Sequence, residues 1–305
     1  AVNEMRGPSK ATCSVLHLIA WVLMMGIVLT GCATKEAPPT AQPKPARIAV
    51  VLGAGASKGF AHIGVLKVLE AQKVPIHMVV GTSAGSLVGS IYAYGKTSYE
   101  LQGIAMKMEK DKVIDYNWKI WTGGLIKGEK LERYVNFMLG NTPMDKLRIP
   151  FYAVATDIRS GQEIVFGTGN TGMAVRASCS IPGIFRPVVI GGSTYVDGGL
   201  VSPVAVNAAR RQGADIVIAV DISAGVQPTA PQGTIETILQ SIDIMYSRIG
   251  ALQTPGADVV IRPNVGSIGS ADFNRRHEAI LEGEKAALNA LPAIRAIVDR
   301  LRAEN

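Results

Sequence analysis

The chain has 305 residues, 48% of them hydrophobic, and a formal net charge of +7. This length and composition can bury one substantial core, so a single α/β domain is expected. A net positive charge is typical of proteins that bind nucleic acid or an anionic membrane surface. Because no dense run of Lys and Arg with interleaved aromatic residues is present, we expect no nucleic-acid partner.

Residues 1–31 have the organisation of a secretory signal peptide. Arg6 and Lys10 precede an apolar stretch that runs to about Thr30. The alternative is a membrane-spanning helix, but the stretch is shorter than the about 20 residues that a span needs. It ends in Leu29-Thr30-Gly31-Cys32, which resembles the lipobox of bacterial lipoproteins. That resemblance implies that Cys32 becomes the first residue of the mature chain and carries lipid, palmitate included.

Residues 32–46 are Pro-rich and polar and lack hydrophobic periodicity. They are predicted to form an extended tether between the lipidated Cys32 and a folded domain at 47–305. Ala33 rather than Asp follows the cysteine, which in enteric-type bacteria indicates the periplasmic face of the outer membrane rather than the inner membrane. Cys179 is the only cysteine of the predicted domain, so no disulfide is expected within it.

The domain begins with a continuous apolar, β-branched run at 48–52, which predicts a buried parallel strand. A glycine-rich loop and a helix at about 60–72 follow. The loop spacing, G-x-G-x-x-x-G, fits neither a dinucleotide-binding turn nor a P-loop. Its backbone N–H groups are candidates for stabilising an oxyanion, or its glycines serve only a tight turn. The candidate oxyanion loop comprises Gly53, Ala54, Gly55, Ala56, Ser57, Lys58 and Gly59.

A second apolar run, at 78–80, leads to Ser83, the main candidate for a catalytic nucleophile. Gly81 and Gly85 flank the serine, and a helix is predicted from there to about Tyr94. A serine on a sharp strand-to-helix turn is the arrangement of a nucleophile elbow. The helix that follows would point its N-terminal N–H groups at the site, where they favour negative charge.

The rest of the chain continues the alternation of strands and helices that predicts a parallel sheet covered by helices. Residues 97–140 are predicted to be mostly helical. Two Trp residues lie within 116–124, which is either a packed loop or a lid that contacts lipid. Further strands are predicted at 151–156, 216–220 and 259–261, a loop at 223–234, and a C-terminal helix at about 275–302 with a candidate break near Pro292.

A serine hydroxyl is a poor nucleophile without a base. His277 has the position in the chain that a Ser–acid–His order needs, but its charged neighbours indicate a solvated helix face. Asp197 is the better candidate, because Gly198 and Gly199 directly after it would let a loop bring the carboxylate close to the serine. An Asp followed by two glycines is otherwise an ordinary turn.

Together these segments resemble the patatin-like phospholipase family over about residues 47–200. The resemblance is carried by the glycine loop, the elbow around Ser83, the Asp197-Gly198-Gly199 motif and the segment 177–187. It implies a three-layer α/β sandwich with a mostly parallel central sheet covered by helices on both faces. It also implies that Ser83 is the nucleophile, Asp197 the base of a dyad and the glycine loop the oxyanion hole, with Lys58 in its basic position.

The expected function is a lipid-anchored serine acyl hydrolase of phospholipase A or lysophospholipase type, working through an acyl-enzyme. Membrane lipids are the expected partners, as substrate and as anchor surface. No cofactor is expected, and no metal either, because the sequence has no His/Cys cluster and its carboxylates lack ligand spacing. The alternatives are a non-catalytic envelope lipoprotein that binds lipid or a protein partner and, against the glycine spacing, a nucleotide-binding protein.

Overall fold

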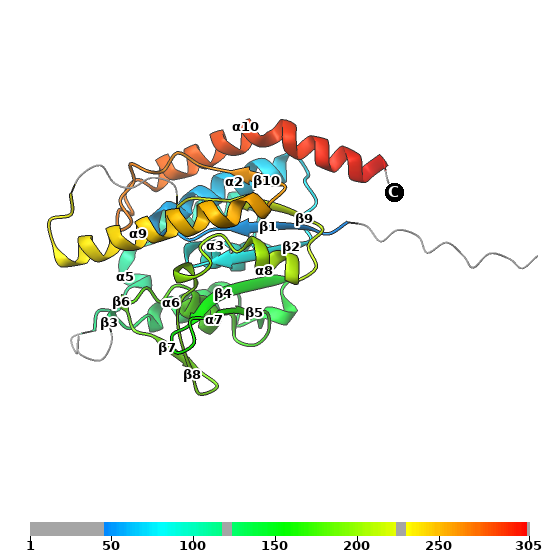
Figure 1. The fold of residues 1–305 in the computed structure, drawn as a ribbon. Helices are drawn as coiled ribbons and strands as arrows, with labels where there is room; N and C mark the ends of the chain where they lie inside the picture. The colour runs from blue at the N-terminus through cyan, green and yellow to red at the C-terminus, as the bar shows by residue number, and fades with distance from the viewer. Residues whose placement is uncertain (1–45, 118–123, 224–229, 304–305) are drawn as a thin grey trace, which may run out of the picture. The chain divides into compact units, whose positions relative to one another are not determined.

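The computed structural model describes residues 46–117, 124–223 and 230–303 (Figure 1). The strands are β1 (Ile48–Leu52), β2 (Met78–Thr82), β3 (Gly124–Ile126), β4 (Phe151–Asp157), β5 (Glu163–Phe166), β6 (Gly183–Phe185), β7 (Val188–Ile190), β8 (Ser193–Asp197), β9 (Ile216–Val220) and β10 (Val259–Ile261). The α-helices are α2 (Phe60–Ala71), α3 (Ala84–Tyr94), α4 (Ser98–Lys107), α5 (Lys110–Val113), α6 (Glu129–Met138), α7 (Thr171–Ser178), α8 (Val206–Arg211), α9 (Thr234–Gln253) and α10 (Arg276–Ala303). Short 3-10 turns include η1 (Ala56–Gly59) and η4 (Gly198–Leu200).

Within these ranges the main sheet has eight strands, in the order β10-β9-β1-β2-β4-β8-β7 with β5 also paired to β4. Strands β10, β9, β1, β2 and β4 are mutually parallel, whereas β5, β7 and β8 are antiparallel to their neighbours. Strands β3 and β6 form a separate pair. The mostly parallel sheet flanked by helices confirms the predicted three-layer α/β fold.

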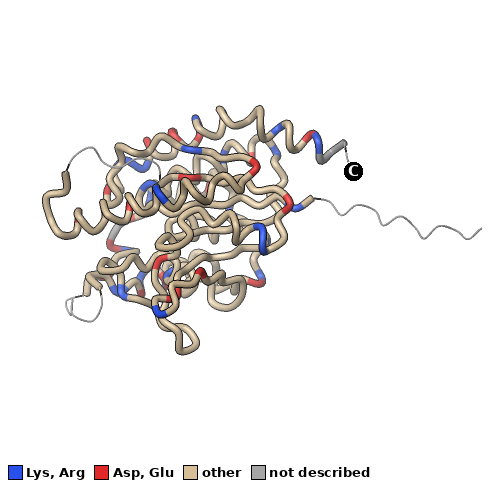
Figure 2. The backbone as a smooth tube through the Cα atoms, in the orientation of Figure 1, with Lys and Arg blue, Asp and Glu red and all other residues tan. Residues whose placement is uncertain are grey.

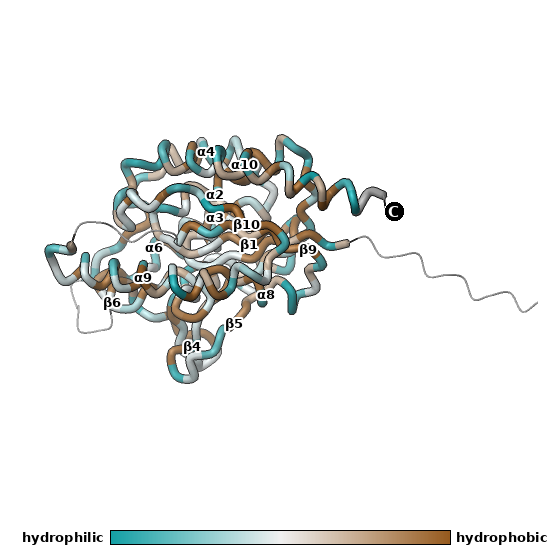
Figure 3. Tube along the Cα trace, turned by 45° about the horizontal axis from the view of Figure 1, so that its top comes forward, coloured by the Kyte–Doolittle hydropathy of each residue, from teal (hydrophilic) through white to brown (hydrophobic). Residues whose placement is uncertain are grey.

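Strand β1 shows why the central strands are apolar throughout. All five of its residues are buried, because side chains alternate between two covered faces. Ile48, Val50 and Leu52 belong to the core shared with α2, α3 and α10. Ala49 and Val51 belong to the core shared with α8. Figure 3 shows the resulting hydrophobic colour of β1, β9 and β10.

The C-terminal helix differs from the prediction. Helix α10 runs without interruption from Arg276 to Ala303 with Pro292 inside it, so the candidate break does not occur. Proline removes one backbone hydrogen bond. Apolar side chains on both sides of it, Leu291, Ile294 and Val298, are buried in the main core. Their packing offsets the lost bond and keeps the helix intact.

The sequence did not predict the short strands β3, β5, β6, β7 and β8. Asp197, expected on a loop, is instead the last residue of β8, and the glycines after it form the turn η4. Strands of three to five half-buried residues carry too little periodicity to be recognised. The signal segment and nearly all of the tether, with Cys32, lie outside the described residues, as does 118–123 of the Trp-containing segment.

Basic and acidic residues are mixed along the described chain (Figure 2). Figure 2 shows Lys and Arg interspersed with Asp and Glu along the trace. Among the helices that the structure describes, none combines the length and the apolar character needed to cross a membrane.

Candidate active site

Ser83 lies on a strained turn between β2 and α3. Its backbone has φ +54° and ψ −123°, a conformation that non-glycine residues rarely adopt. The flanking glycines leave no room for a side chain. A Cβ at Gly81 would lie 2.5 Å from the carbonyl oxygen of Gly85, and one at Gly85 would lie 2.0 Å from that of Leu52. Both glycines are therefore required where the turn passes so close to the backbone of β1 and α3.

The pairing of β4 explains how Ser83 meets Asp197. Parallel strand β2 pairs with the first part of β4, where Thr82 lies opposite Val154. Antiparallel strand β8 pairs with the last part, where Asp197 lies opposite Ala155. Because β5 pairs with β4 over both parts, β2 and β8 must share the other edge. The carboxyl ends of β2 and β8 therefore meet head to head, and Ser83 follows β2 directly.

The two side chains make a short, buried hydrogen bond. The Ser83 hydroxyl donates to Asp197 Oδ2 over 2.6 Å, and the residues are 2% and 0% exposed. The second carboxylate oxygen, Oδ1, accepts from the N–H of Gly199 over 2.7 Å. Thr156 Oγ1 donates to the backbone carbonyl of Asp197 over 2.8 Å. The carboxylate is thus held at both oxygens, with one of them directed at the serine.

Burial changes the acidity of this carboxylate. It raises the pKa of Asp197 from 3.8 to about 6, against the opposing effect of hydrogen bonds from Ser83 and Gly199 and of the nearby Tyr246 hydroxyl. A carboxyl group with this pKa is mostly ionised at neutral pH, yet it is much more basic than an exposed aspartate. Asp197 is therefore suited to accept a proton from Ser83.

The segment 177–187 fastens both residues to the sheet. The Ser178 hydroxyl accepts from the N–H of Ser83 over 2.9 Å and donates to the carbonyl of Val154 over 2.6 Å. The carbonyl of Ser180 accepts from the N–H of Asp197 over 2.9 Å. The sequence drew attention to this segment through the resemblance alone, and it assigned no individual role to Ser178.

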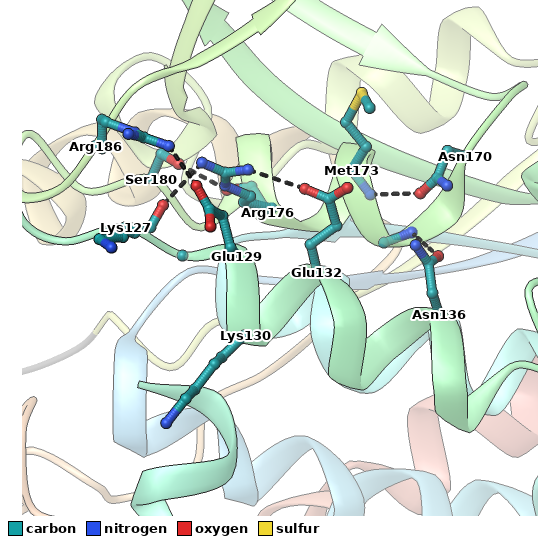
Figure 4. A network of polar contacts seen from close by, with 12 residues as sticks. Lys127, Glu129, Lys130, Glu132, Asn136, Asn170, Met173, Arg176, Ser180 and Arg186 are labelled. Atoms are coloured by element: carbon teal, nitrogen blue, oxygen red, sulfur yellow. Dashed lines mark hydrogen bonds and ion pairs between the residues drawn. The ribbon is translucent and has the colours of Figure 1, made fainter. Parts of the chain in front are cut away.

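Helix α7 and the residues after it are themselves held by polar contacts with α6 (Figure 4). The Arg176 guanidinium lies 2.9 Å from Glu132 and donates to the carbonyl of Lys127 over 2.8 Å. Arg186 lies 2.6 Å from Glu129. These contacts fix the two ends of the segment that supports Ser83 and Asp197.

The predicted oxyanion loop forms the turn η1 and packs against the start of α3. A Cβ at Gly59 would lie 2.5 Å from the Cβ of Ala84, the residue after Ser83. Many N–H groups of the loop already donate to backbone carbonyls: Gly53 to Val220, Ala54 to Pro203, Ser57 to Ser270 and Lys58 to Gly55. Within the described ranges the N–H groups of Gly55 and Ala56 make no such contact.

Lys58 has its charge engaged inside the protein. Its side chain is completely buried, and Nζ donates to Asp243 Oδ2 of α9 over 3.0 Å. Ser270 Oγ donates to the same oxygen over 2.7 Å. The Ser57 hydroxyl donates to the carbonyl of Gly269 over 2.6 Å. Helix α9 and residues 269–270 therefore hold the glycine loop in place through these contacts. No local motif predicted this role for Asp243.

Apolar surroundings adjoin the site on two sides. A cavity of about 60 Å³ extends from Ala56, Gly59 and Ala84 between α2, α3 and α4, and its lining includes Phe60, Leu87, Ile91, Leu101 and Met108. On the other side, Ala54 and Tyr246 belong to an apolar cluster with Ile126, Ile181, Ile184 and Ile242. The buried dyad therefore lies close to two groups of apolar side chains.

None of the described histidines makes a hydrogen bond with Ser83 or Asp197. His62 Nε2 donates to the carbonyl of Gly53 over 2.8 Å, and burial lowers the pKa of His62 to about 4, so the ring supports the loop as a neutral group. His77 Nδ1 accepts from the N–H of Ile48 over 3.0 Å. His277 is exposed on α10. In the part of the chain that the structure describes, no group of three or more His, Cys, Asp or Glu residues could hold a metal ion.

Comparison with known sequences places these features in a family. The family model described as patatin-like phospholipase matches residues 50–210, just over half of the chain. An uncharacterized NTE family protein of Mycobacterium tuberculosis is 29% identical over 273 residues, which cover 81% of this chain and 46% of that protein. Lysophospholipase NTE1 of Pyricularia oryzae is 26% identical over 280 residues, which cover 81% of this chain and 18% of that protein. The chain therefore spans less than half the length of these relatives.

A solved structure shares the fold. The crystal structure of VipD from Legionella pneumophila superposes with a TM-score of 0.58 at 13% sequence identity, covering 82% of this chain and 67% of that chain. At this identity the similarity concerns the fold alone. The matched family segment ends before α9, so Asp243 and Tyr246 lie beyond it.

Proposed function

Because the chain belongs to the patatin-like phospholipase family, we propose that it hydrolyses carboxylic ester bonds of lipids, with Ser83 as nucleophile and Asp197 as base. The observation that carries this proposal is the 2.6 Å hydrogen bond from Ser83 Oγ to Asp197 Oδ2 where β2 and β8 meet. A hydroxyl that already donates to a carboxylate with a pKa of about 6 is prepared to lose its proton at neutral pH.

In this mechanism Ser83 Oγ attacks the ester carbonyl carbon while its proton passes to Asp197. The carbonyl oxygen becomes an oxyanion, for which the N–H groups of Gly55 and Ala56 are the proposed donors. Asp197 then gives the proton to the leaving alkoxide as its C–O bond breaks. Water, deprotonated by Asp197, attacks the acyl-serine, and the fatty acid leaves as Ser83 recovers its proton.

The proposed substrates are phospholipids or lysophospholipids. The cavity beside Ala56 and Ala84 is lined by apolar side chains, which favours the acyl chain of a lipid over a polar acyl group. The similarity to a protein named lysophospholipase supports the same class. The enzyme class proposed is accordingly a carboxylic ester hydrolase of phospholipase A or lysophospholipase type.

The N-terminal sequence adds a proposal about location. Removal of residues 1–31 and lipidation of Cys32 would anchor the domain at 47–305 through the tether 32–46. A lipid anchor would keep the enzyme at the membrane that holds its substrate. We propose the periplasmic face of the outer membrane as that surface.

The test compares the full chain with Ser83→Ala and Asp197→Asn on a short-chain chromogenic ester and on vesicles of mixed phospholipid and lysophospholipid. We expect both variants to lose at least about a thousandfold in kcat. Ser90→Ala is the matched control, because Ser90 is a buried serine of α3, the helix that follows Ser83, and it should keep its activity. Mass spectrometry should find a fluorophosphonate probe on Ser83.

Folding of each variant is checked by circular dichroism. A folded wild-type protein without Ser83-dependent hydrolysis of either substrate would contradict the proposal and favour a non-catalytic lipoprotein that binds lipid or a partner. Hydrolysis that survives in Asp197→Asn would assign the base to another group.

A further inference from the structure

Tyr246 lies against the Asp197 motif although it comes from α9, beyond the matched family segment. Its side chain is 2% exposed. A Cβ at Gly199 would lie 2.3 Å from Cζ of Tyr246 and 2.6 Å from its hydroxyl oxygen, so the tyrosine ring rests directly on Gly199. The N–H of the same glycine donates to Asp197 Oδ1. The phenol therefore borders the carboxylate of the dyad.

The Tyr246 hydroxyl is buried and meets the geometry of a hydrogen bond with no group in the described ranges. Buried hydroxyls nearly always have a partner, and leaving one without costs about 1–3 kcal/mol. Burial raises the pKa of Tyr246 well above its ordinary value, and the nearby carboxylates of Asp197 and Asp243 and the Cys179 thiol raise it further. The phenol thus keeps its proton at neutral pH and can donate it in a hydrogen bond to a carboxylate.

We propose that Tyr246 is a positioning residue of the dyad, whose hydroxyl donates to the Asp197 carboxylate during turnover and holds it towards Ser83. This inference rests on the proposed function. The proton that moves is that of Ser83, which passes to Asp197 and then to the leaving alkoxide. Tyr246 keeps its own proton throughout and changes no bond of the substrate.

The role has a signature that a purely structural tyrosine would lack. The polar groups that face Asp197 are the Ser83 hydroxyl, the Gly199 N–H, the Cys179 thiol and the Tyr246 hydroxyl. A donor to a carboxylate favours its ionised form, so removing the Tyr246 hydroxyl raises the pKa of Asp197. The base is active only when ionised. The acid limb of the activity profile should therefore move to higher pH.

The experiment measures kcat/KM on the short-chain ester from pH 4.5 to 9 for the full chain and for Tyr246→Phe, with Ser83→Ala in parallel. We expect the acid limb of Tyr246→Phe to rise by about 0.5–1 pH unit and kcat at pH 7 to fall severalfold, with KM little changed. Tyr134→Phe on α6, at a half-buried tyrosine, is the control and should reproduce the wild-type profile.

An acid limb for Tyr246→Phe that coincides with that of the wild type would overturn the role, whatever its effect on stability. If Tyr246→Phe does not fold, 3-fluorotyrosine at position 246 retains the shape and is a stronger donor, and its acid limb should move to lower pH. An unmoved limb there overturns the role too. Absence of Ser83-dependent hydrolysis in the wild type would instead overturn the proposed function, so the two failures are distinct.

Discussion

The Nζ of Lys58 lies 3.0 Å from Oδ2 of Asp243 in the protein interior, across 185 residues of sequence. This ion pair links the glycine loop beside Ser83 to helix α9. Burial makes such a pair sensitive to the loss of one partner, because the other charge is then left without compensation. Helix α9 thereby becomes a structural part of the site although no local motif marks it.

Removal of one partner of this pair should destabilise the protein strongly. We expect Asp243→Leu to lower the free energy of unfolding by about 3–5 kcal/mol, and Lys58→Met/Asp243→Leu to lower it by less than the sum of the two single variants. Urea unfolding of the wild type, Lys58→Met, Asp243→Leu and the double variant measures the coupling free energy between the two side chains. The exposed pair Lys112–Glu109 is the control, with a coupling of at most about 1 kcal/mol. If the losses of unfolding free energy at Lys58 and Asp243 are additive, the two charges do not stabilise each other.

The pKa of Asp197 sets a pH dependence for hydrolysis. Because the base must be ionised and its pKa is about 6, kcat/KM should be half-maximal near pH 6 and fall about tenfold per pH unit below it. The measurement is hydrolysis of the short-chain ester between pH 4.5 and 8, with circular dichroism to show that the protein stays folded. Full activity at pH 4.5 would exclude Asp197 as the titrating base.

The raised pKa of Asp197 also predicts that the stability of the protein falls with increasing pH, whereas its activity rises. A carboxyl group whose pKa is higher in the folded state is disfavoured as a charge there, so stability is lost as pH rises from about 4 to above 6. A shift from 3.8 to about 6 corresponds to about 3 kcal/mol. Asp197→Asn keeps an acceptor for Gly199 and carries no charge. It should be about 2–3 kcal/mol more stable than the wild type at pH 8 and equally stable below pH 4.

Urea unfolding at pH 4 and pH 8 tests this difference. A gain of the same size at both values would place its origin in packing rather than in the charge of Asp197.

The turn at Ser83 should not tolerate a side chain at Gly85. A Cβ there would lie 2.0 Å from the carbonyl oxygen of Leu52, and neither backbone can give way. We expect Gly85→Ala to cost about 3 kcal/mol or more and to abolish labelling of Ser83 by a fluorophosphonate. Gly103→Ala is the control. Gly103 lies inside α4 with open space around it, so this change should stabilise the protein by about 0.5–1 kcal/mol.

The proposed lipid anchor depends on one sulfur atom. Cys32→Ala removes the only side chain that the lipobox would modify, so the protein should move from the membrane fraction to the soluble fraction of the bacterial envelope. Hydrolysis of the short-chain ester should be retained. Unchanged fractionation would contradict lipidation at Cys32. Ala33→Asp is the companion variant, expected to shift the protein to the inner membrane if Ala33 directs sorting.

Local patterns predicted the elements whose physical cause is local. The strands β9 and β10 have the bounds expected from their apolar runs, because strands buried on both faces read as continuous hydrophobic segments. Ser83 became a candidate because a turn with this little room needs glycine at 81 and 85. The short strand β8 was not predicted, since three of its five residues are only partly buried and do not alternate with buried ones. Its pairing with β4 also joins segments that lie far apart in the sequence.

By itself the sequence determined the mostly parallel α/β fold, the elbow and the pair of residues worth testing, because apolar runs and glycines act within a few positions of each other. Only the tertiary structure decided what surrounds that pair. The meeting of β2 and β8 on one edge of β4, the burial that raises the pKa of Asp197, and the contacts of Asp243 and Tyr246 all join residues tens to hundreds of positions apart. Such contacts form only when the whole chain folds. The local sequence around a side chain that makes them does not differ from the sequence around a side chain that faces water.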